Sequence, residues 1–185
     1  MVYFKFDREK ALAALLFIAK ELIDNLGSRG PSIHKIFKIL YFAEQKHLAR
    51  YGRFIFGDDY IAMRAGPVPS KIYDMVKLVR GDSVVEDMLE LNQYFRVSNY
   101  FVYPIQEPEM GEFSESDLEC ITESLTENQG LSFDELTQKS HDSAYLKSDK
   151  NDRISYLEIA KAAGVDDAML AYIKSLSENE RILHR

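Results

Sequence analysis

The residues most able to do chemistry in this chain of 185 residues are His141 and the adjacent Asp142. A histidine beside a carboxylate can serve as a general base, so the pair raises the hypothesis of an enzyme. However, no nucleophile elbow, catalytic cysteine motif or phosphate-binding glycine loop accompanies it. Neighbouring residues on a helix also do not face each other. We therefore expect Asp142 or Ser143 to cap a helix, with no catalytic role for the pair.

Metal-binding spacings are not found in the sequence. The four histidines stand at positions 34, 47, 141 and 184, without the H-E-x-x-H or paired Cys/His spacing of zinc sites. Asp58 and Asp59 could ligate a hard cation, but no third ligand is suitably spaced, and two acidic residues after Gly57 are typical of a turn. We expect neither a metal nor a cofactor.

Composition bounds the class of protein. A chain that is 46% hydrophobic and 29% charged suits one globular domain over residues 1–185. No apolar run reaches the roughly 18–20 residues that span a membrane, and the first residues lack the apolar stretch of a signal peptide. The single cysteine, Cys120, excludes an internal disulfide and fits a reducing compartment. These features predict a cytoplasmic protein.

Charge is spread unevenly along the chain. Residues 1–80 hold 14 Lys/Arg and 8 Asp/Glu, a net +6, whereas residues 81–185 hold 9 and 22, a net −13. Two solvated faces of unlike sign would explain this, and so would a surface that steers a charged partner. The acidic half disfavours nucleic acid as a partner and would suit a basic protein.

Hydrophobic periodicity predicts a mainly α fold, a compact bundle of about seven or eight helices with a small antiparallel β hairpin or sheet inserted. The expected helices cover residues 8–26, 33–50, 71–80, 83–90, 115–127, 132–139, 155–163 and 166–177, and the expected strands cover 60–64, 94–97 and 100–105. The Gly66–Pro69 segment holds two prolines and cannot be a central strand or a helix. We expect the tail after residue 177 to fray.

Capping residues support these helix boundaries. Asp7, Ser32 and Ser70 each precede a helical pattern, as N-cap residues do. Three S-x-x-[DE] pairs match the capping box: Ser114/Asp117, Ser132/Glu135 and Ser155/Glu158.

The helix expected at 33–50 carries a basic stripe formed by Lys35, Lys38, Lys46 and Arg50. We interpret this stripe as the solvent side of the helix, opposite its apolar face. Contact with a protein partner is an alternative interpretation. DNA reading by a helix-turn-helix formed with the preceding helix is another.

The most specific pattern lies between Lys38 and Asp74. It combines an amphipathic helix, a Tyr-Gly-Arg turn, a Gly-Asp-Asp loop, a short strand and a Gly-Pro-Val-Pro corner. Its residues are Lys38, Ile39, Leu40, Tyr41, Ala43, Leu48, Tyr51, Gly52, Arg53, Gly57, Asp58, Tyr60, Ala62, Gly66, Pro67, Val68, Tyr73 and Asp74. In their order and spacing the chain resembles the SocA-like antitoxins of the Panacea domain, also described as GepA-type phage-associated proteins.

Later segments continue this resemblance, which runs from about Ala11 to Ile173. The matching residues there are Phe113–Asp117, Leu131, Ser132, Glu135, Leu136, Ser140 and His141. Two departures are small: Tyr145 stands where the family usually has Trp, and Phe113 replaces a leucine.

The resemblance implies an antitoxin, not an enzyme, that neutralises a cognate protein toxin from an adjacent gene by direct contact. A DNA-binding regulator of its own operon and a protease adaptor that delivers the toxin are the alternatives, and a homo-oligomer is left open. The implied site residues, either scaffold or toxin-binding, are Tyr41, His47, Tyr51, Gly52, Arg53, Gly57, Asp58, Tyr60, Gly66, Pro67, Pro69, Tyr73 and His141. Among them we expect Arg53 and Asp58 to pair and hold the loop.

Overall fold

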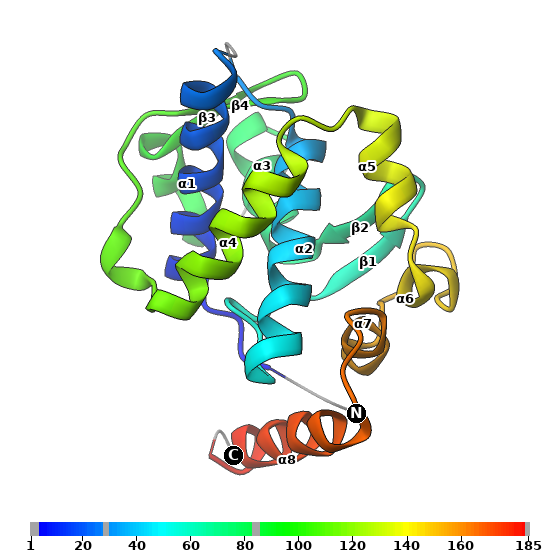
Figure 1. Cartoon of the computed structure of the whole chain (residues 1–185). Helices are drawn as coiled ribbons and strands as arrows, with labels where there is room; N and C mark the ends of the chain where they lie inside the picture. Colours follow the sequence, from blue (N-terminus) through cyan, green and yellow to red (C-terminus); the bar gives the residue numbers. More distant parts are fainter. Residues whose placement is uncertain (1–3, 28–29, 83–85, 184–185) are drawn as a thin grey trace.

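The computed structural model describes residues 4–27, 30–82 and 86–183, and in these it has eight α-helices and two antiparallel sheets of two strands each (Figure 1). The helices are α1 (Arg8–Leu26), α2 (Ile33–Tyr51), α3 (Ser70–Arg80), α4 (Glu115–Asn128), α5 (Phe133–Ser140), α6 (Ser143–Leu146), α7 (Tyr156–Ala162) and α8 (Asp167–Leu183). The strands are β1 (Tyr60–Met63), β2 (Gly66–Pro69), β3 (Phe95–Ser98) and β4 (Phe101–Pro104). Two 3-10 helices cover Glu86–Gln93 and Met110–Glu112. The mainly α fold with a small β insertion is confirmed.

Helix α2 is the central element. In Figure 1, α4 crosses in front of it, while α1 and α5 lie on its two sides, and it also contacts α7 and β2. The nine residues from Ile36 to Glu44 are all buried. Because nine residues make two and a half helical turns, this part of α2 is covered on every side.

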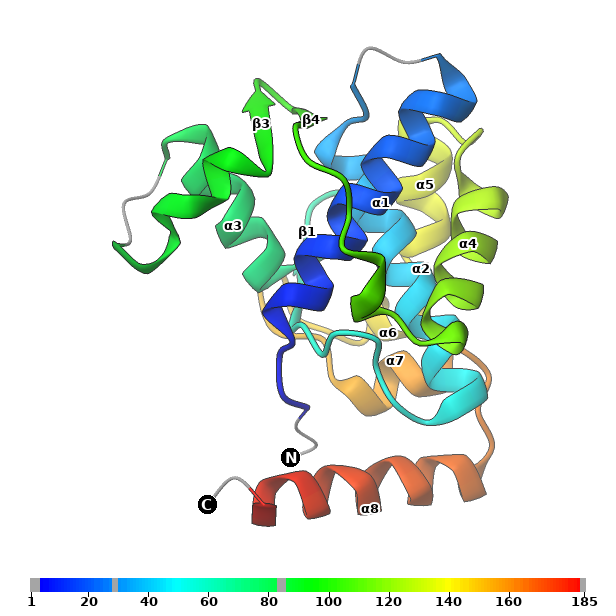
Figure 2. The ribbon, with the colours of Figure 1, turned by 90° about the vertical axis from the view of Figure 1, so that its left-hand side faces the viewer.

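Two apolar clusters lie around α2. One joins α1, α2, α3, α4 and the β3–β4 hairpin through residues such as Leu15, Leu40 and Ile121. The other joins α2, β1 and α5 to α8 through residues such as Tyr41 and Ile159. Figure 2 shows α8 at one end of the molecule, next to α7.

Most of the expected caps are present. Asp7 accepts the Lys10 N–H at 3.1 Å, and Ser32 accepts the Lys35 N–H at 3.2 Å. The capping boxes of α4 and α5 each show both reciprocal bonds. Gly52 ends α2 in the left-handed conformation, with φ of 69°. There a glycine suits both the backbone and the Tyr172 ring, which a Cβ would meet at 2.6 Å.

The expected capping box of Ser155 and the expected Ser70 cap were wrong, although Ser155 does occupy the N-cap position of α7. Ser155 makes no side-chain capping bond, and Glu158 instead contacts the ammonium groups of Lys147 and Lys161, each at 2.6 Å. Ser70 begins α3 instead of capping it. The acceptor at this helix start is the buried Asp58 carboxylate, which lies in the loop before β1.

Other differences concern the ends of elements. The Gly66–Pro69 segment forms β2, which its prolines tolerate because β2 is paired on one side only, with β1. Leu26, the last residue of α1, is 47% exposed, although the apolar spacing of this helix places it on the buried face. Helix α8 continues to Leu183, where fraying was expected, and residues 184–185 lie outside the described part. The helix expected at 83–90 is a 3-10 helix over Glu86–Gln93, and residues 83–85 are likewise outside.

The β3–β4 hairpin was predicted and is confirmed. Phe95 pairs with Pro104 and Ser98 with Phe101, so Asn99 and Tyr100 form the turn. Asn99 has φ of 55°, a left-handed conformation that asparagine adopts more readily than most residues. The hairpin docks on the start of α2, where the Ile33 N–H donates to the Tyr100 carbonyl at 2.8 Å.

Asp58 anchors the start of α3, so its removal should destabilise the fold. Its Oδ1 and Oδ2 atoms accept the Lys71 and Ile72 N–H groups at 3.0 and 2.9 Å. We expect Asp58→Ala to lower the free energy of unfolding by about 2–4 kcal/mol, because two backbone donors lose a charged acceptor, one of them buried. Asp58→Asn should lose less, since it keeps one acceptor oxygen. Urea unfolding measures the change.

The control is Ser155→Ala, which removes an exposed hydroxyl that makes no capping bond. Equal unfolding midpoints for Asp58→Ala and Ser155→Ala would contradict this role of Asp58.

Candidate functional site

Most of the implied site residues lie in the interior. The side chains of Tyr41, His47, Asp58 and Tyr60 are buried. The Tyr41 hydroxyl donates to the Asp142 carboxylate at 2.8 Å, whereas the buried Tyr60 hydroxyl makes no hydrogen bond. Burial of this kind is typical of residues that hold a scaffold together. Gly57, Pro67 and Pro69 are buried too, in the turns and strand around them.

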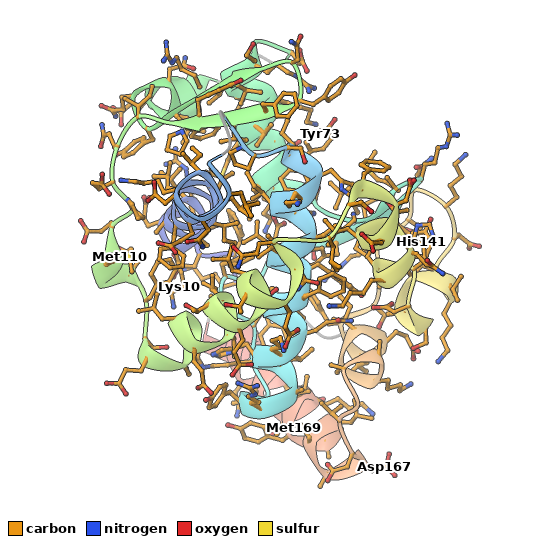
Figure 3. The ribbon with its side chains drawn as sticks, turned by 45° about the horizontal axis from the view of Figure 1, so that its top comes forward. Lys10, Tyr73, Met110, His141, Asp167 and Met169 are labelled. Carbon is orange, nitrogen blue, oxygen red and sulfur yellow. The ribbon has the colours of Figure 1, made fainter. Side chains whose placement is uncertain are left out.

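Four of the implied site residues reach the surface or line a cavity, and one of them is Arg53, whose side chain is 41% exposed. Tyr51 is exposed at the end of α2, and its hydroxyl donates to Glu119 at 2.8 Å. His141 is half-buried at the end of α5, and its ring stacks on Tyr145. Tyr73 lines the cavity described below. Figure 3 labels Tyr73 beside the start of α2 and His141 at the end of α5.

The buried carboxylate of Asp117 joins α1, α2 and α4. It lies 3.0 Å from the Lys10 ammonium, 3.1 Å from the His47 ring and 3.4 Å from the Arg53 guanidinium. Figure 3 shows Lys10 on α1 beside α4. Burial opposes ionisation, but hydrogen bonds from His47, Ser114 and Lys10 outweigh it and lower the pKa of Asp117. The expected Arg53–Asp58 pair was therefore wrong, because Arg53 binds Asp117 and Asp58 caps α3.

The adjacent His141 and Asp142 do not form a hydrogen-bonded pair. Asp142 Oδ1 accepts the Ala144 and Tyr145 N–H groups, both at 3.0 Å, so Asp142 is the expected helix cap. Its Oδ2 accepts from Tyr41 and from Gln45 on α2. Both carboxylate oxygens thus bind other partners, and the Nε2 atom of His141 is buried without one.

The basic stripe of α2 is not a free surface. Lys46 and Arg50 bind carboxylates of α4 at 2.5–3.6 Å, namely those of Glu119, Glu123 and Glu127. Lys35 donates to the Gln129 carbonyl at 2.6 Å. The solvent-facing interpretation was wrong for the fourth member, Lys38, which is buried.

A cavity of about 510 Å³ opens beside the first half of α2. Its walls come from α2, α3, α5, the β1–β2 turn and the β3–β4 turn. The lining residues are Ser32, Ile33, His34, Phe37, Lys38, Met63, Arg64, Ala65, Val68, Tyr73, Arg80, Tyr100 and Phe133. A cavity of this size with apolar walls and a few polar groups is typical of a binding site.

Lys38 lies in the wall of this cavity and is only 1% exposed. Its ammonium donates to the Pro67 carbonyl at 2.8 Å, and it takes part in none of the ion pairs among the described residues. Burial lowers the pKa of Lys38 to about 7. Gly66 makes room for this side chain: it has φ of +96°, and a Cβ there would lie 3.0 Å from Lys38 Cε and against the Ser140 hydroxyl.

His34 lies one turn before Lys38 in the same wall. Its Nε2 atom is 3.1 Å from the Thr137 hydroxyl, and its ring stacks on Phe133 with centroids 4.0 Å apart. Its Nδ1 atom is buried without a hydrogen bond. Burial, and then the nearby Lys38 charge, lower the pKa of His34 to about 4, so the ring is neutral at pH 7.

Comparison with known proteins decides the family. The sequence model of the family described as "Antitoxin SocA-like, Panacea domain" matches residues 36–145, more than half of the chain. The chain belongs to this family. No curated protein and no solved structure matches it. The Panacea match runs from the end of the first turn of α2 to Tyr145 in α6, and it includes Lys38, Arg64, Tyr73, Tyr100 and Phe133 of the cavity.

The described residues show neither a metal-binding cluster nor a membrane-spanning helix. No group of three His, Cys, Asp or Glu residues among them is arranged to hold a metal ion. None of their helices combines the length and the apolar character needed to cross a membrane.

The cavity itself was missed by sequence reasoning. Of the implied site residues, only Tyr73 lines it. One signal could have pointed to Lys38, because it is the only charged residue in the run from Ile36 to Ala43. A continuous apolar run indicates a helix buried on all sides, where a lysine needs a special reason.

The buried Lys38 should make stability depend on pH. Its pKa is about 7 in the folded protein and near 10.4 when unfolded, so the unfolded chain binds more protons between these values. Burial of Lys38 therefore lowers the free energy of unfolding by its full amount below about pH 7, and this destabilisation disappears as pH rises toward 10. We expect Lys38→Met to be more stable than the parent by a few kcal/mol at pH 7, and this gap to shrink at roughly 1.4 kcal/mol per pH unit above that.

Urea unfolding of both proteins from pH 6 to 10 measures this gap. Burial lowers the pKa values of His34, to about 4, and of His141, and both histidines also lie near Lys38. The control is Lys150→Met, at an exposed lysine, where the difference from the parent should not change with pH. If the difference in unfolding free energy between Lys38→Met and the parent were also independent of pH, the burial of a charged Lys38 would be refuted.

Proposed function

We propose that this Panacea-domain protein is the antitoxin of a toxin–antitoxin pair and neutralises its cognate toxin by direct binding. Membership of the SocA-like antitoxin family is the observation that carries the proposal. On this proposal the partner is a protein toxin encoded in an adjacent gene. On this proposal the toxin is held inactive by occlusion, without catalysis by the antitoxin.

The way the polar groups are used supports binding over catalysis. The carboxylate of Asp142, the most enzyme-like candidate in the sequence, caps α6 and binds Tyr41 and Gln45. The Asp117 carboxylate is likewise occupied by Lys10, His47 and Arg53. Side chains committed to such contacts stabilise the fold but are not free to transfer protons.

The same contacts weigh against reading DNA with α2. Lys46, Arg50 and Arg53 bind carboxylates of α4, and Lys38 is buried. Phosphate binding needs cations that are free to neutralise phosphate groups, which releases the counterions of the nucleic acid. We therefore place the partner-binding surface elsewhere and take the partner to be a protein.

Co-expression with the product of each neighbouring gene tests the function. We expect one neighbour to arrest growth, the antitoxin to restore it, and the two proteins to co-purify as a stable complex. The interface should bury about 1,200–2,000 Å². Rescue without a complex would contradict neutralisation by binding and point to delivery of the toxin to a protease. The absence of any toxic neighbour would contradict the antitoxin role itself.

A further inference from the structure

Two aromatic side chains at the mouth of the cavity are unusually exposed. Tyr100, in the β3–β4 turn, is 72% exposed, and Phe133, the first residue of α5, is 55% exposed. Both also line the cavity. Exposed aromatic residues beside a cavity are typical of protein interfaces, where they become the residues that contribute most binding energy.

The charge of the lining is one-sided. Three cations, Lys38, Arg64 and Arg80, and no carboxylate line the cavity of a protein whose net charge is −7. Arg80 is bound to Asp82, whereas Lys38 and Arg64 take part in none of the ion pairs among residues 4–27, 30–82 and 86–183. A negatively charged group that fills this cavity would form ion pairs with both Lys38 and Arg64.

The position of Lys38 makes this argument stronger. Buried charges are normally paired, because leaving water is costly and only a nearby opposite charge compensates for it. Lys38 has a carbonyl acceptor, that of Pro67, but no carboxylate. The buried, unpaired Lys38 destabilises the free protein. Its presence is explained if a bound molecule supplies the opposite charge.

We propose that this cavity is the docking site for the toxin, and that it receives an apolar side chain of the toxin flanked by a carboxylate. The inference rests on the proposed antitoxin function and names the surface and the partner chemistry. The apolar side chain lies among Phe37, Val68 and Tyr73, and the carboxylate reaches Lys38 or Arg64. A protein fits better than a free small molecule, since a ligand inside the cavity would leave Tyr100 and Phe133 largely in water.

The acidic face of α4 is the main competitor, and it is less suitable. Its groove is lined by Glu115, Glu119, Glu123 and Glu127, which would attract a basic toxin. However, Glu119, Glu123 and Glu127 already bind Arg50 or Lys46 of the same protein. A basic partner would have to displace these internal ion pairs.

Substitutions on the two faces, measured by affinity for the cognate toxin and by rescue of growth, test the proposal. On the cavity side the variants are Arg64→Glu, Tyr100→Ala and Phe133→Ala, all at exposed side chains whose change should leave the fold intact. Each should weaken toxin binding at least about tenfold. Lys38→Met should do the same while remaining folded.

Matched controls show whether these losses of binding are specific to the cavity or follow from any change of an exposed apolar or charged side chain. Leu146→Ala removes an apolar side chain that is 72% exposed, the same fraction as Tyr100, and Lys150→Glu reverses an exposed charge as Arg64→Glu does. Neither lies in the cavity, and both should bind the toxin within about twofold of the parent. Thr122→Arg places a bulky cation in the α4 groove and should also have little effect. Thermal unfolding of each variant verifies that it is folded.

Three results would overturn the proposal. Loss of binding in Thr122→Arg, with the cavity variants unaffected, would move the toxin to α4 while leaving the antitoxin function in place. Cavity variants that lose binding of 3-phenylpropionate but keep the toxin would make the cavity a small-molecule site; 3-phenylpropanamide, which lacks the charge, is the control ligand. Failure of the parent protein itself to bind or rescue would overturn the proposed function, and this inference with it.

Discussion

The enclosure of α2 is the constraint on which the rest of this structure depends. Residues 36–44 are covered on every side, so each polar side chain among them must find its partner inside the protein. Tyr41 finds the helix cap Asp142, and Glu44 accepts the N–H groups of Ile55 and Phe56 in the loop after α2. Burial raises the pKa of Glu44 to about 8, against these bonds. The central helix thereby fixes α6 and the loop before β1. Neither Glu44 nor Lys38 takes part in an ion pair among the described residues, but of the two only Lys38 lines the cavity.

The uneven charge of the sequence is largely explained by pairing within the molecule. Bases of the first eighty residues meet acids of α4, as when Lys10 binds Asp117 and Arg50 binds Glu119 and Glu123. Neither two separate solvated faces nor an acidic docking surface describes this arrangement. The α4 carboxylates that the sequence suggested for a basic partner serve α2 instead. The unpaired positive charge at the cavity therefore becomes more significant.

Local signals predicted the helices well and the contacts between them poorly. Asp7, Ser32, Ser114 and Ser132 cap helices as expected, because a cap and its donors lie within three residues. The cap of α3 could not be predicted in this way, since the acceptor, Asp58, lies in a loop twelve residues before Ser70. The prediction that Lys38 faces solvent was wrong because a helical stripe assumes one buried and one exposed face, and α2 has no exposed face at that point.

The same limit explains why the family pattern did not reveal the cavity, although Lys38, Val68 and Tyr73 belong to both. The family pattern marks positions that must close turns or fill the interior, such as Gly66 against Lys38 or Asp58 at α3. The cavity is assembled from α2, α3, α5 and two hairpin turns that stand far apart in sequence, so no local pattern describes it. The two sets of residues still meet at Lys38, where the Pro67 carbonyl accepts its hydrogen bond. The buried motif thus holds a charged group in the wall of an open cavity. A scaffold that bears this cost is best understood if binding repays it.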